Sequence, residues 1–319
     1  MRKRRDNGDG RLDDAARAGW LYYVAGNTQD EIAAKLGISR QSAQRLVSLA
    51  VSEGLVKVRL DHPLADCLEL AERLRERYGL AYCEVVPSDP ASDSTTLGIA
   101  DAAAAEIERQ LKSPDMKVMA IGTGRTLKAA GELLPRIDAP DKKIVSLTGN
   151  FAPDGSAAFY SVIFTMADVV NARHYPLPLP VVAASPAERD LLHRQIVVRS
   201  ALALAAQADV TFVGIGDLGP KAPLLQDGFI TRAELAALKQ AGAVMEIVGW
   251  AFDGEGRLID GLTNARVASA PLPSRDRSKV IAVAMGDAKL PGLRVAIEHR
   301  LVNGLITDER TAKKIAGGR

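Results

Sequence analysis

The chain has 319 residues, of which 47% are hydrophobic and 4% aromatic, and its formal net charge is +2 at pH 7. This length exceeds one ordinary domain, and the apolar content suffices for a large globular core built from Ala, Val, Leu and Ile. No apolar run approaches the roughly 20 residues that span a bilayer, and the charged N-terminus is unlike a secretory signal, so we expect no membrane partner and a cytoplasmic protein.

Residues 28–54, TQDEIAAKLGISRQSAQRLVSLAVSEG, predict two short helices joined by a tight turn at Gly37. Thr28 suits the N-cap of the first helix, and Glu31 three residues later completes a capping box. The apolar residues that follow at helical spacing are Ile32, Ala33 and Leu36.

The second helix of this pair begins at Ser39, and Ile38 before it fills the space between the two helices. Its inward face consists of Ala43, Leu46, Val47 and Ala50. An apolar helix over residues 15–24, which includes Trp20 and Leu21, can brace the pair. Together these features predict a helix-turn-helix module.

The outward face of the second helix carries side chains suited to DNA. Arginine donates to guanine and glutamine pairs with adenine in the major groove. We expect the DNA contacts to come from Ser39, Arg40, Gln41, Ser42, Gln44 and Arg45. A basic arm at residues 2–5 and the charge of the first 60 residues, eleven Lys or Arg against seven Asp or Glu, also suit a polyanion. The alternative is a helical bundle that never meets DNA.

A boundary follows near residues 55–63, where LVKVRLDHP predicts a short β-ribbon that ends at a proline. Residues 64–78 then place apolar side chains at helical spacing, which suits a linker helix that can also pair subunits. We therefore divide the chain into a DNA-binding domain over residues 1–60, a linker helix over 61–80 and a second, larger domain over 81–319.

Beyond residue 79, short β-rich runs alternate with longer helical patterns. The runs are residues 82–86, 118–121, 144–147, 210–215 and 280–284, with helices such as 97–111 and 197–208 between them. Continuous apolar strands separated by helices predict an α/β fold with a doubly wound, mostly parallel sheet. In such sheets a ligand binds at the carboxyl ends of the strands.

The strand that ends at Ile121 runs through the sequence GTGRT directly into a helix. Glycines let the backbone approach an anion, and the free N–H groups and dipole of a helix start attract it. The expected phosphate cradle comprises Gly122, Thr123, Gly124, Arg125 and Thr126. The loop lacks the Gly-Lys-Ser/Thr ending of a nucleotide P-loop, and the alternative is a structural turn from strand to helix.

A second glycine-marked strand end, VGIGDLG at residues 213–219, formally contains GxGxxG. Pro220 stands where a helix should continue, and no acidic residue marks a second Rossmann strand, so we expect no dinucleotide. The segment instead suits a second wall of the ligand cleft, with Asp217 as an acceptor for hydroxyl groups.

The order of several segments resembles the SorC family of bacterial transcriptional regulators over nearly the whole chain. The segments are the helix pair at 28–56, IGTGRTL at 121–127, SLTGN at 146–150, YPLPLPVVAASPAERDLL at 175–192, GIGDLG at 214–219, GAVMEIVGWAFDGEG at 242–256 and the stretch from 280 to 315. The resemblance implies a C-terminal effector domain related in fold to sugar-phosphate isomerases and glucosamine-phosphate deaminases. It also implies a dimer or tetramer that binds operator DNA and a phosphorylated sugar or polyol, and that controls a carbohydrate operon.

Position by position, the resemblance also implies the effector contacts. Gly122, Thr123, Gly124 and Thr126 match the family's phosphate loop. Glu246 matches an acid suited to sugar hydroxyls, and Lys289 matches a lysine suited to a phosphate or another anionic group. The expected effector-binding residues are Gly122, Thr123, Gly124, Arg125, Thr126, Asn150, Asp217, Glu246 and Lys289.

The sequence departs from the family pattern at sugar-facing positions. Met285 precedes Gly286 where a double glycine is usual, Met245 occupies a position often held by glycine, and residues 157–161 lack a common asparagine. The simplest implication is an effector of different size or shape. Both repression and activation fit this sequence.

The rival function is an enzyme that isomerises, deaminates or cleaves a sugar phosphate. Asp217 and Glu246 are candidates for its acid and base, and Lys289 or Lys128 for an amine. The chain lacks the DGxD…KGGG arrangement of ribose-phosphate isomerases and the DGIGxxGH loop of the deaminases, so we expect no catalytic residues. A third possibility is a structural binder that uses the helix pair for protein contact.

The cysteines and histidines do not predict a metal site. Cys67 and Cys83 are the only two cysteines, too few and too far apart for a metal or disulfide framework. The histidines His174, His193 and His299 are scattered without ligand spacing. We expect free thiols, no metal and no cofactor.

Overall fold

The computed structural model describes residues 7–56, 64–89, 96–152, 155–156 and 160–317. The chain divides into two compact units, Met1–His62 and Pro63–Arg319. Within the described residues, no helix has both the length and the apolar character needed to cross a membrane.

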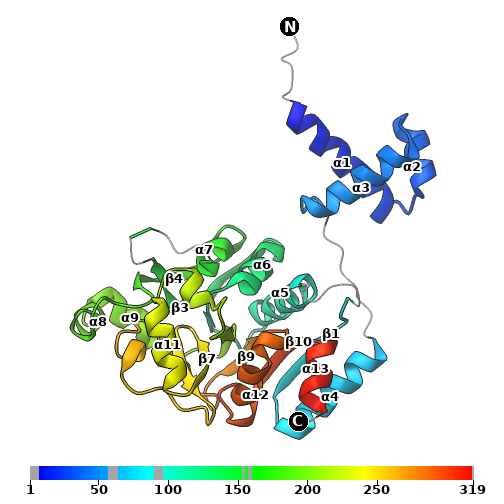
Figure 1. Ribbon diagram of the computed structural model, residues 1–319. Helices are drawn as coiled ribbons and strands as arrows, with labels where there is room; N and C mark the ends of the chain where they lie inside the picture. The colour runs from blue at the N-terminus through cyan, green and yellow to red at the C-terminus, as the bar shows by residue number, and fades with distance from the viewer. Residues whose placement is uncertain (1–6, 57–63, 90–95, 153–154, 157–159, 318–319) are drawn as a thin grey trace. The chain divides into compact units, whose positions relative to one another are not determined.

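The first unit consists of the helices α1 (Asn7–Tyr23), α2 (Gln29–Leu36) and α3 (Arg40–Ser52) (Figure 1). The Thr28 hydroxyl accepts the Glu31 N–H at 3.3 Å, and the Glu31 carboxylate accepts the Thr28 N–H at 2.7 Å. Gly37 ends α2 in the left-handed conformation with φ 66°, which a residue with a Cβ rarely adopts. The predicted capping box and turn are therefore confirmed.

The core of this unit is small and lies between the three helices. Ala18, Ile32, Ala33, Ala43 and Val47 are buried together, with Leu21, Leu36, Ile38 and Leu46 packed against them. The predicted inward face of the second helix is thus confirmed. Trp20, by contrast, is 55% exposed, so α1 braces the pair through its small residues and Leu21.

The second unit is built on a seven-stranded sheet in the order β1-β10-β9-β5-β2-β3-β4, and all six pairings are parallel. The strands are β1 (Tyr82–Val86), β2 (Val118–Ile121), β3 (Ile137–Phe151), β4 (Val170–Pro180), β5 (Val210–Val213), β9 (Lys279–Val283) and β10 (Gly304–Asp308). The prediction of a doubly wound, mostly parallel α/β sheet is confirmed.

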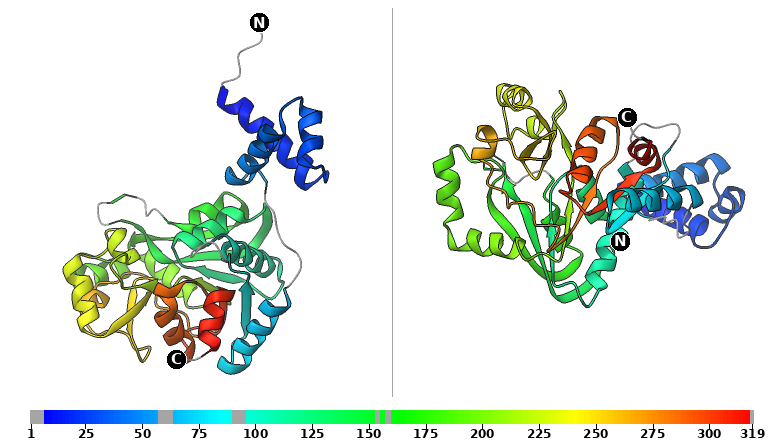
Figure 2. Two further views of the ribbon diagram at one scale, coloured as in Figure 1. Left: turned by 45° about the vertical axis from the view of Figure 1, so that its right-hand side comes forward. Right: turned by 90° about the horizontal axis from the view of Figure 1, so that it is seen from below.

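Helices cover both faces of this sheet and bury an apolar cluster on each (Figure 2). One face is covered by α5 (Thr96–Lys112), α6 (Arg125–Leu133) and α7 (Val162–Ala167). The other is covered by α4 (Ala65–Tyr78), α9 (Ile196–Ala205), α12 (Leu290–Glu298) and α13 (Glu309–Ala316), with α8 (Pro186–His193) leading into α9.

A smaller antiparallel sheet follows β5. It comprises β6 (Gly216–Asp217), β7 (Ala243–Ile247) and β8 (Trp250–Asp253), and it packs with α10 (Pro223–Gln226) and α11 (Arg232–Gln240) around a third apolar cluster. The remaining short helices are the 3-10 turns η1 (Leu262–Ala265) and η2 (Asp287–Lys289).

The order of the strands reverses between β2 and β5. From β2 the chain moves outward through β3 and β4, and from β5 it moves the opposite way through β9 and β10. The loops after β2 and β5 therefore diverge to opposite sides and leave a crevice at their carboxyl ends, where open α/β sheets bind ligands.

Two strands of the large sheet, β4 and β10, were not expected. β4 contains Pro176, Pro178 and Pro180. Prolines cannot donate a hydrogen bond to a neighbouring strand, but an edge strand such as β4 tolerates them. β10 also has no counterpart among the predicted runs.

The helix predicted at 64–78 forms as α4, whose Leu70 and Leu74 are buried in the second unit's core. Its linker and pairing roles remain predictions, and the ribbon predicted at 55–63 lies outside the described residues beyond Val56.

Candidate functional site

The outward face of α3 is free of core contacts. Arg40, Gln41, Gln44 and Arg45 are all exposed, whereas Ala43 and Val47 of the same helix are buried. Among the described residues, these four side chains form one ion pair, in which the Asp30 carboxylate lies 3.5 Å from Arg40 Nε with both side chains 69% exposed. Such an exposed pair is weak and leaves Arg40 able to reach a polyanion.

The two serines at the start of α3 have a structural role in this unit. The Ser39 hydroxyl accepts the Ser42 N–H at 3.2 Å and lies 2.9 Å from the Ser42 hydroxyl. They cap the helix and hold its first turn in place. The predicted basic arm at residues 2–5 lies outside the described residues.

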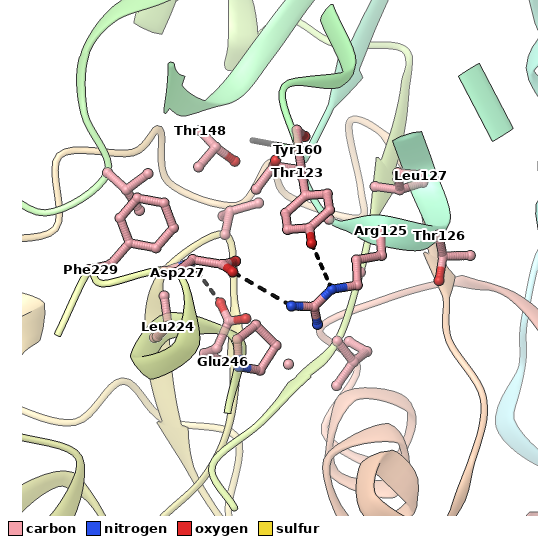
Figure 3. A pocket seen from close by; sticks show the side chains of 18 of the residues that line it. Thr123, Arg125, Thr126, Leu127, Thr148, Tyr160, Leu224, Asp227, Phe229 and Glu246 are labelled. Atoms are coloured by element: carbon pink, nitrogen blue, oxygen red, sulfur yellow. Dashed lines mark hydrogen bonds and ion pairs between the residues drawn. The ribbon is translucent and has the colours of Figure 1, made fainter. Parts of the chain in front are cut away.

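A cavity of about 560 Å³ lies in the second unit at the crevice between β2 and β5. Its walls come from the segments after β2, β5 and β9 and from the end of β3, together with the small sheet and α10 (Figure 3). A cavity of this size and position is typical of a site for a small organic ligand.

The loop after β2 forms one wall of the cavity, although Gly122, the first residue of the expected cradle, is not part of the lining and its N–H donates to the Phe212 carbonyl at 2.8 Å. Gly124, with φ 125°, is the N-cap of α6, and no side chain of the described residues caps that helix start. Its first N–H groups are therefore available to an anion. Thr123, Gly124, Arg125 and Thr126 all line the cavity, and the Thr123 hydroxyl donates to the Tyr160 carbonyl.

Arg125 connects three segments across the cavity (Figure 3). Its Nε donates to the Tyr160 hydroxyl at 3.0 Å, and its guanidinium lies 4.9 Å from the centre of the Tyr160 ring. One terminal nitrogen lies 3.6 Å from the Asp227 carboxylate. Burial raises the pKa of Asp227, although the Arg125 charge opposes this. Arg125 is thus held over the cavity in a position to meet an anionic group.

Glu246 and Lys289 face the same cavity from β7 and from the turn after β9. The Glu246 carboxylate accepts the Gly249 N–H at 2.8 Å. Burial raises the pKa of Glu246, against the effects of this hydrogen bond and of Lys289. Burial also lowers the pKa of Lys289, while Glu246 and Asp217 act in the opposite direction. Both charged groups have lost water and can gain from a polar ligand.

Asp217 lines the cavity and Asn150 does not. Asp217 accepts the Gly219 N–H at 2.9 Å, which fixes the turn after β6. Asn150 is buried in β3, where its amide donates to the Leu177 carbonyl at 3.4 Å and its oxygen accepts the Ser161 hydroxyl at 3.1 Å. The structure thus gives Asn150 partners within the protein, and an effector contact at this residue has no geometric support.

Several residues that line the cavity were not foreseen from the sequence. They are Thr148, Tyr160, Lys221, Leu224, Asp227, Phe229 and Val248. Leu224 lies in α10, and the others lie in loops or strands outside the two glycine-marked strand ends at 121–126 and 213–219, so neither of those patterns marks them. Leu224, Phe229 and Val248 give the cavity an apolar side, which suits the C–H faces of a sugar or polyol.

The groups named for a rival enzyme are only partly assembled. Asp217, Glu246 and Lys289 share the cavity, whereas Lys128 is not part of its lining and pairs with Glu132 along α6. Among the described residues, no three His, Cys, Asp or Glu side chains are grouped as metal ligands.

Comparisons with known proteins place these features among transcriptional regulators. A family model described as "Putative sugar-binding domain" matches residues 62–316. The chain is 34% identical over 303 residues to the erythritol catabolism regulatory protein EryD of Brucella abortus, covering 95% of this chain and 96% of EryD. It is 29% identical over 308 residues to the transcriptional regulator LsrR of Escherichia coli K12, covering 95% of this chain and 94% of LsrR.

A solved structure has a similar fold over the full chain. The sorbitol operon regulator SorC from Klebsiella pneumoniae superposes with a TM-score of 0.72 at 22% identity, covering 98% of this chain and 99% of SorC. At this identity the likeness concerns the fold.

Proposed function

Because the chain belongs to the SorC family of sugar-binding transcriptional regulators, we propose that it is a DNA-binding regulator of a carbohydrate or polyol catabolic operon. A phosphorylated sugar or polyol bound in the cavity sets its affinity for operator DNA. The observation that carries the effector part is the cavity at the strand switch point, with an uncapped helix start on one wall and the partly buried Glu246 and Lys289 on another.

The chemistry of the walls supports one orientation of such an effector. The N–H groups at the start of α6, together with Arg125, suit the phosphate. Carboxylates at Asp217 and Glu246 accept hydrogen bonds from hydroxyl groups, and Lys289 donates to a phosphate or another anionic oxygen. The name of EryD concerns erythritol catabolism, so phosphorylated four-carbon polyols belong among the first ligands to test.

The DNA-reading part of the proposal rests on α3. Arg40, Gln41, Gln44 and Arg45 contact base edges in the major groove, while Ser39 and Ser42 fix the helix start near the backbone phosphates and residues 2–5 add basic contacts. Two modules of a symmetric oligomer, a dimer or a tetramer, read the two halves of the operator in the cytoplasm.

Effector binding and DNA binding are linked as a two-state switch. The effector closes the cavity around the loop at 122–126, and α4, which starts the second unit, transmits the change to the pairing of subunits. An effector can shift operator affinity only by the ratio of its own affinities for the two states.

A ligand screen followed by an operator assay tests the proposal. Thermal melting of the full chain with a panel of phosphorylated sugars and polyols should reveal a ligand, because one present at 100 times its Kd adds about 2.7 kcal/mol of stability. That ligand should then change the binding of DNA from the region upstream of the protein's own operon. No retention of this DNA at low salt would contradict the DNA-binding role, and turnover of a panel member would favour an enzyme.

A further inference from the structure

The segment SLTGN at residues 146–150 forms an interruption in the large sheet. Val145 pairs with Tyr175 and Gly149 pairs with Leu177, so three residues of β3 oppose only Pro176 of β4. Pro176 has no N–H to donate, and the ladder is broken at this point. Bulges of this kind redirect side chains and are common beside ligand sites.

The interruption is held rigidly by its neighbours. The Ser146 hydroxyl donates to the Thr148 carbonyl at 2.8 Å, and the Leu147 carbonyl accepts the Ala270 N–H at 2.7 Å. A Cβ on Gly149 would lie 2.4 Å from the Leu179 carbonyl oxygen, so only glycine permits this approach of β4. Asn150 binds the Leu177 carbonyl on the far side of the bulge.

This arrangement leaves the Thr148 hydroxyl without a partner, covered just beneath the cavity wall. Thr148 is 1% exposed and lines the cavity. Five buried side-chain polar atoms of the described residues lack a hydrogen bond, in Thr148, His174, Thr263, Ser269 and Thr307, and Thr148 alone of these five residues lines this cavity. Figure 3 labels it among the side chains that line the cavity.

We infer that Thr148 is a specificity-determining residue whose hydroxyl, after rotation of the side chain toward the cavity, hydrogen-bonds a hydroxyl group on the carbon chain of the effector, an inference that rests on the proposed function. A buried hydroxyl without a partner is unfavourable, and a threonine hydroxyl can both donate to and accept from an alcohol. A ligand with an oxygen at this point satisfies the group, whereas an analogue without that oxygen leaves it unpaired. Sites built in this way discriminate strongly against the analogue.

Two variants separate this role from a structural one. Thr148→Val keeps the shape and removes the hydroxyl, and Thr148→Ser keeps the hydroxyl. Thr307→Val is the matched control, because its hydroxyl is also buried and unpartnered but does not line the cavity. Without ligand, Thr148→Val should melt no lower than the wild type, since it removes an unsatisfied polar group.

The probes are erythritol 4-phosphate and its monodeoxy analogues, ribose 5-phosphate with 2-deoxyribose 5-phosphate, and inorganic phosphate, titrated by calorimetry into the full chain. We expect Thr148→Val to bind the best sugar or polyol phosphate about tenfold more weakly, with Thr148→Ser within about threefold of the wild type. Thr307→Val should bind like the wild type. For one deoxy analogue, wild type and Thr148→Val should bind equally, and inorganic phosphate should not distinguish them.

The outcomes that overturn the inference differ from those that overturn the proposed function. If the wild type binds a panel member and Thr148→Val binds it equally, Thr148 does not read the effector. A lower melting temperature of ligand-free Thr148→Val with unchanged affinity would assign the hydroxyl to an internal structural role. Weaker binding of inorganic phosphate alone would assign it to the phosphate. If the wild type binds no member of the panel, the proposed effector class fails, and the inference fails with it.

Discussion

Arg45 tests the DNA-binding face at the level of one side chain. It is exposed on α3, so its removal should leave the fold intact. We expect Arg45→Ala to weaken operator binding by about 1–3 kcal/mol while effector affinity is unchanged. Fluorescence anisotropy with labelled operator measures the first quantity and calorimetry the second. Arg232→Ala removes an equal charge from the exposed start of α11 and serves as the control.

Thr123 tests the effector cavity separately from the DNA-binding face. Its hydroxyl lines the cavity and donates to the Tyr160 carbonyl, so Thr123→Val loosens the wall that faces the phosphate. Effector affinity should fall about tenfold, whereas operator binding without effector should stay at the wild-type level. Thr123→Ser should restore most of the affinity. Equal loss of both activities in Thr123→Val or in Arg45→Ala would show that the two sites are not separate.

Glu246 predicts a pH dependence of stability. Burial raises its folded-state pKa above the ordinary 4.5, so the folded protein holds this proton more tightly than the unfolded chain. The resulting stability is full below the ordinary pKa and is lost as the pH rises through the raised value. Glu246→Gln should therefore gain melting temperature relative to the wild type as the pH rises from about 5 to about 8. Curves that stay parallel, as expected for exposed Glu255→Gln, would contradict this.

Some residues of the cavity lining could be predicted from the sequence, and others could not. The residues at 123–126 were predicted because glycines after a strand and before a helix are a local pattern with a local cause. Asn150 and Thr148 lie two positions apart, and the sequence favoured Asn150. The interruption opposite Pro176 decides which of them lines the cavity, and that pairing is not visible in either segment by itself.

At the scale of an element, the capping box of α2 should carry measurable stability. Thr28→Ala removes the acceptor for the Glu31 N–H and should lower the free energy of unfolding of the first unit by about 1 kcal/mol. The chain has two tryptophans, so in a Trp250→Phe background the fluorescence of Trp20 reports the unfolding of this unit alone. Thr28→Ser should unfold like the parent, and an unchanged midpoint for Thr28→Ala would show that the cap is dispensable.

Elements marked by a local pattern were predicted, whereas β4 and β10 were not. The helices at 28–54 combine caps and an apolar stripe, and both patterns are local. β4 was not predicted, because its three prolines argue against a strand unless the strand lies at a sheet edge. The edge position is a property of the whole sheet, so only the folded chain reveals it.

At the scale of the whole molecule, the proposed coupling is reciprocal. If effector changes operator affinity by a factor between roughly 5 and 150, saturating operator DNA must change effector affinity by the same factor. Calorimetric titration of effector into free and operator-bound protein measures this second factor, with Arg45→Ala as the uncoupled control. Unequal factors would contradict a single two-state linkage, and factors of one would show independent sites.

By itself, the sequence determined the helix-turn-helix pattern, the parallel α/β class and the glycine loop after β2, because each is marked by a pattern of residues close in the chain. The tertiary structure decided which strands are neighbours, and so placed the crevice between β2 and β5. It brought Arg125, Asp227, Glu246 and Lys289 to one cavity although as many as 164 positions separate them. Such groups meet only through strand order and register, and these depend on the packing of the whole sheet.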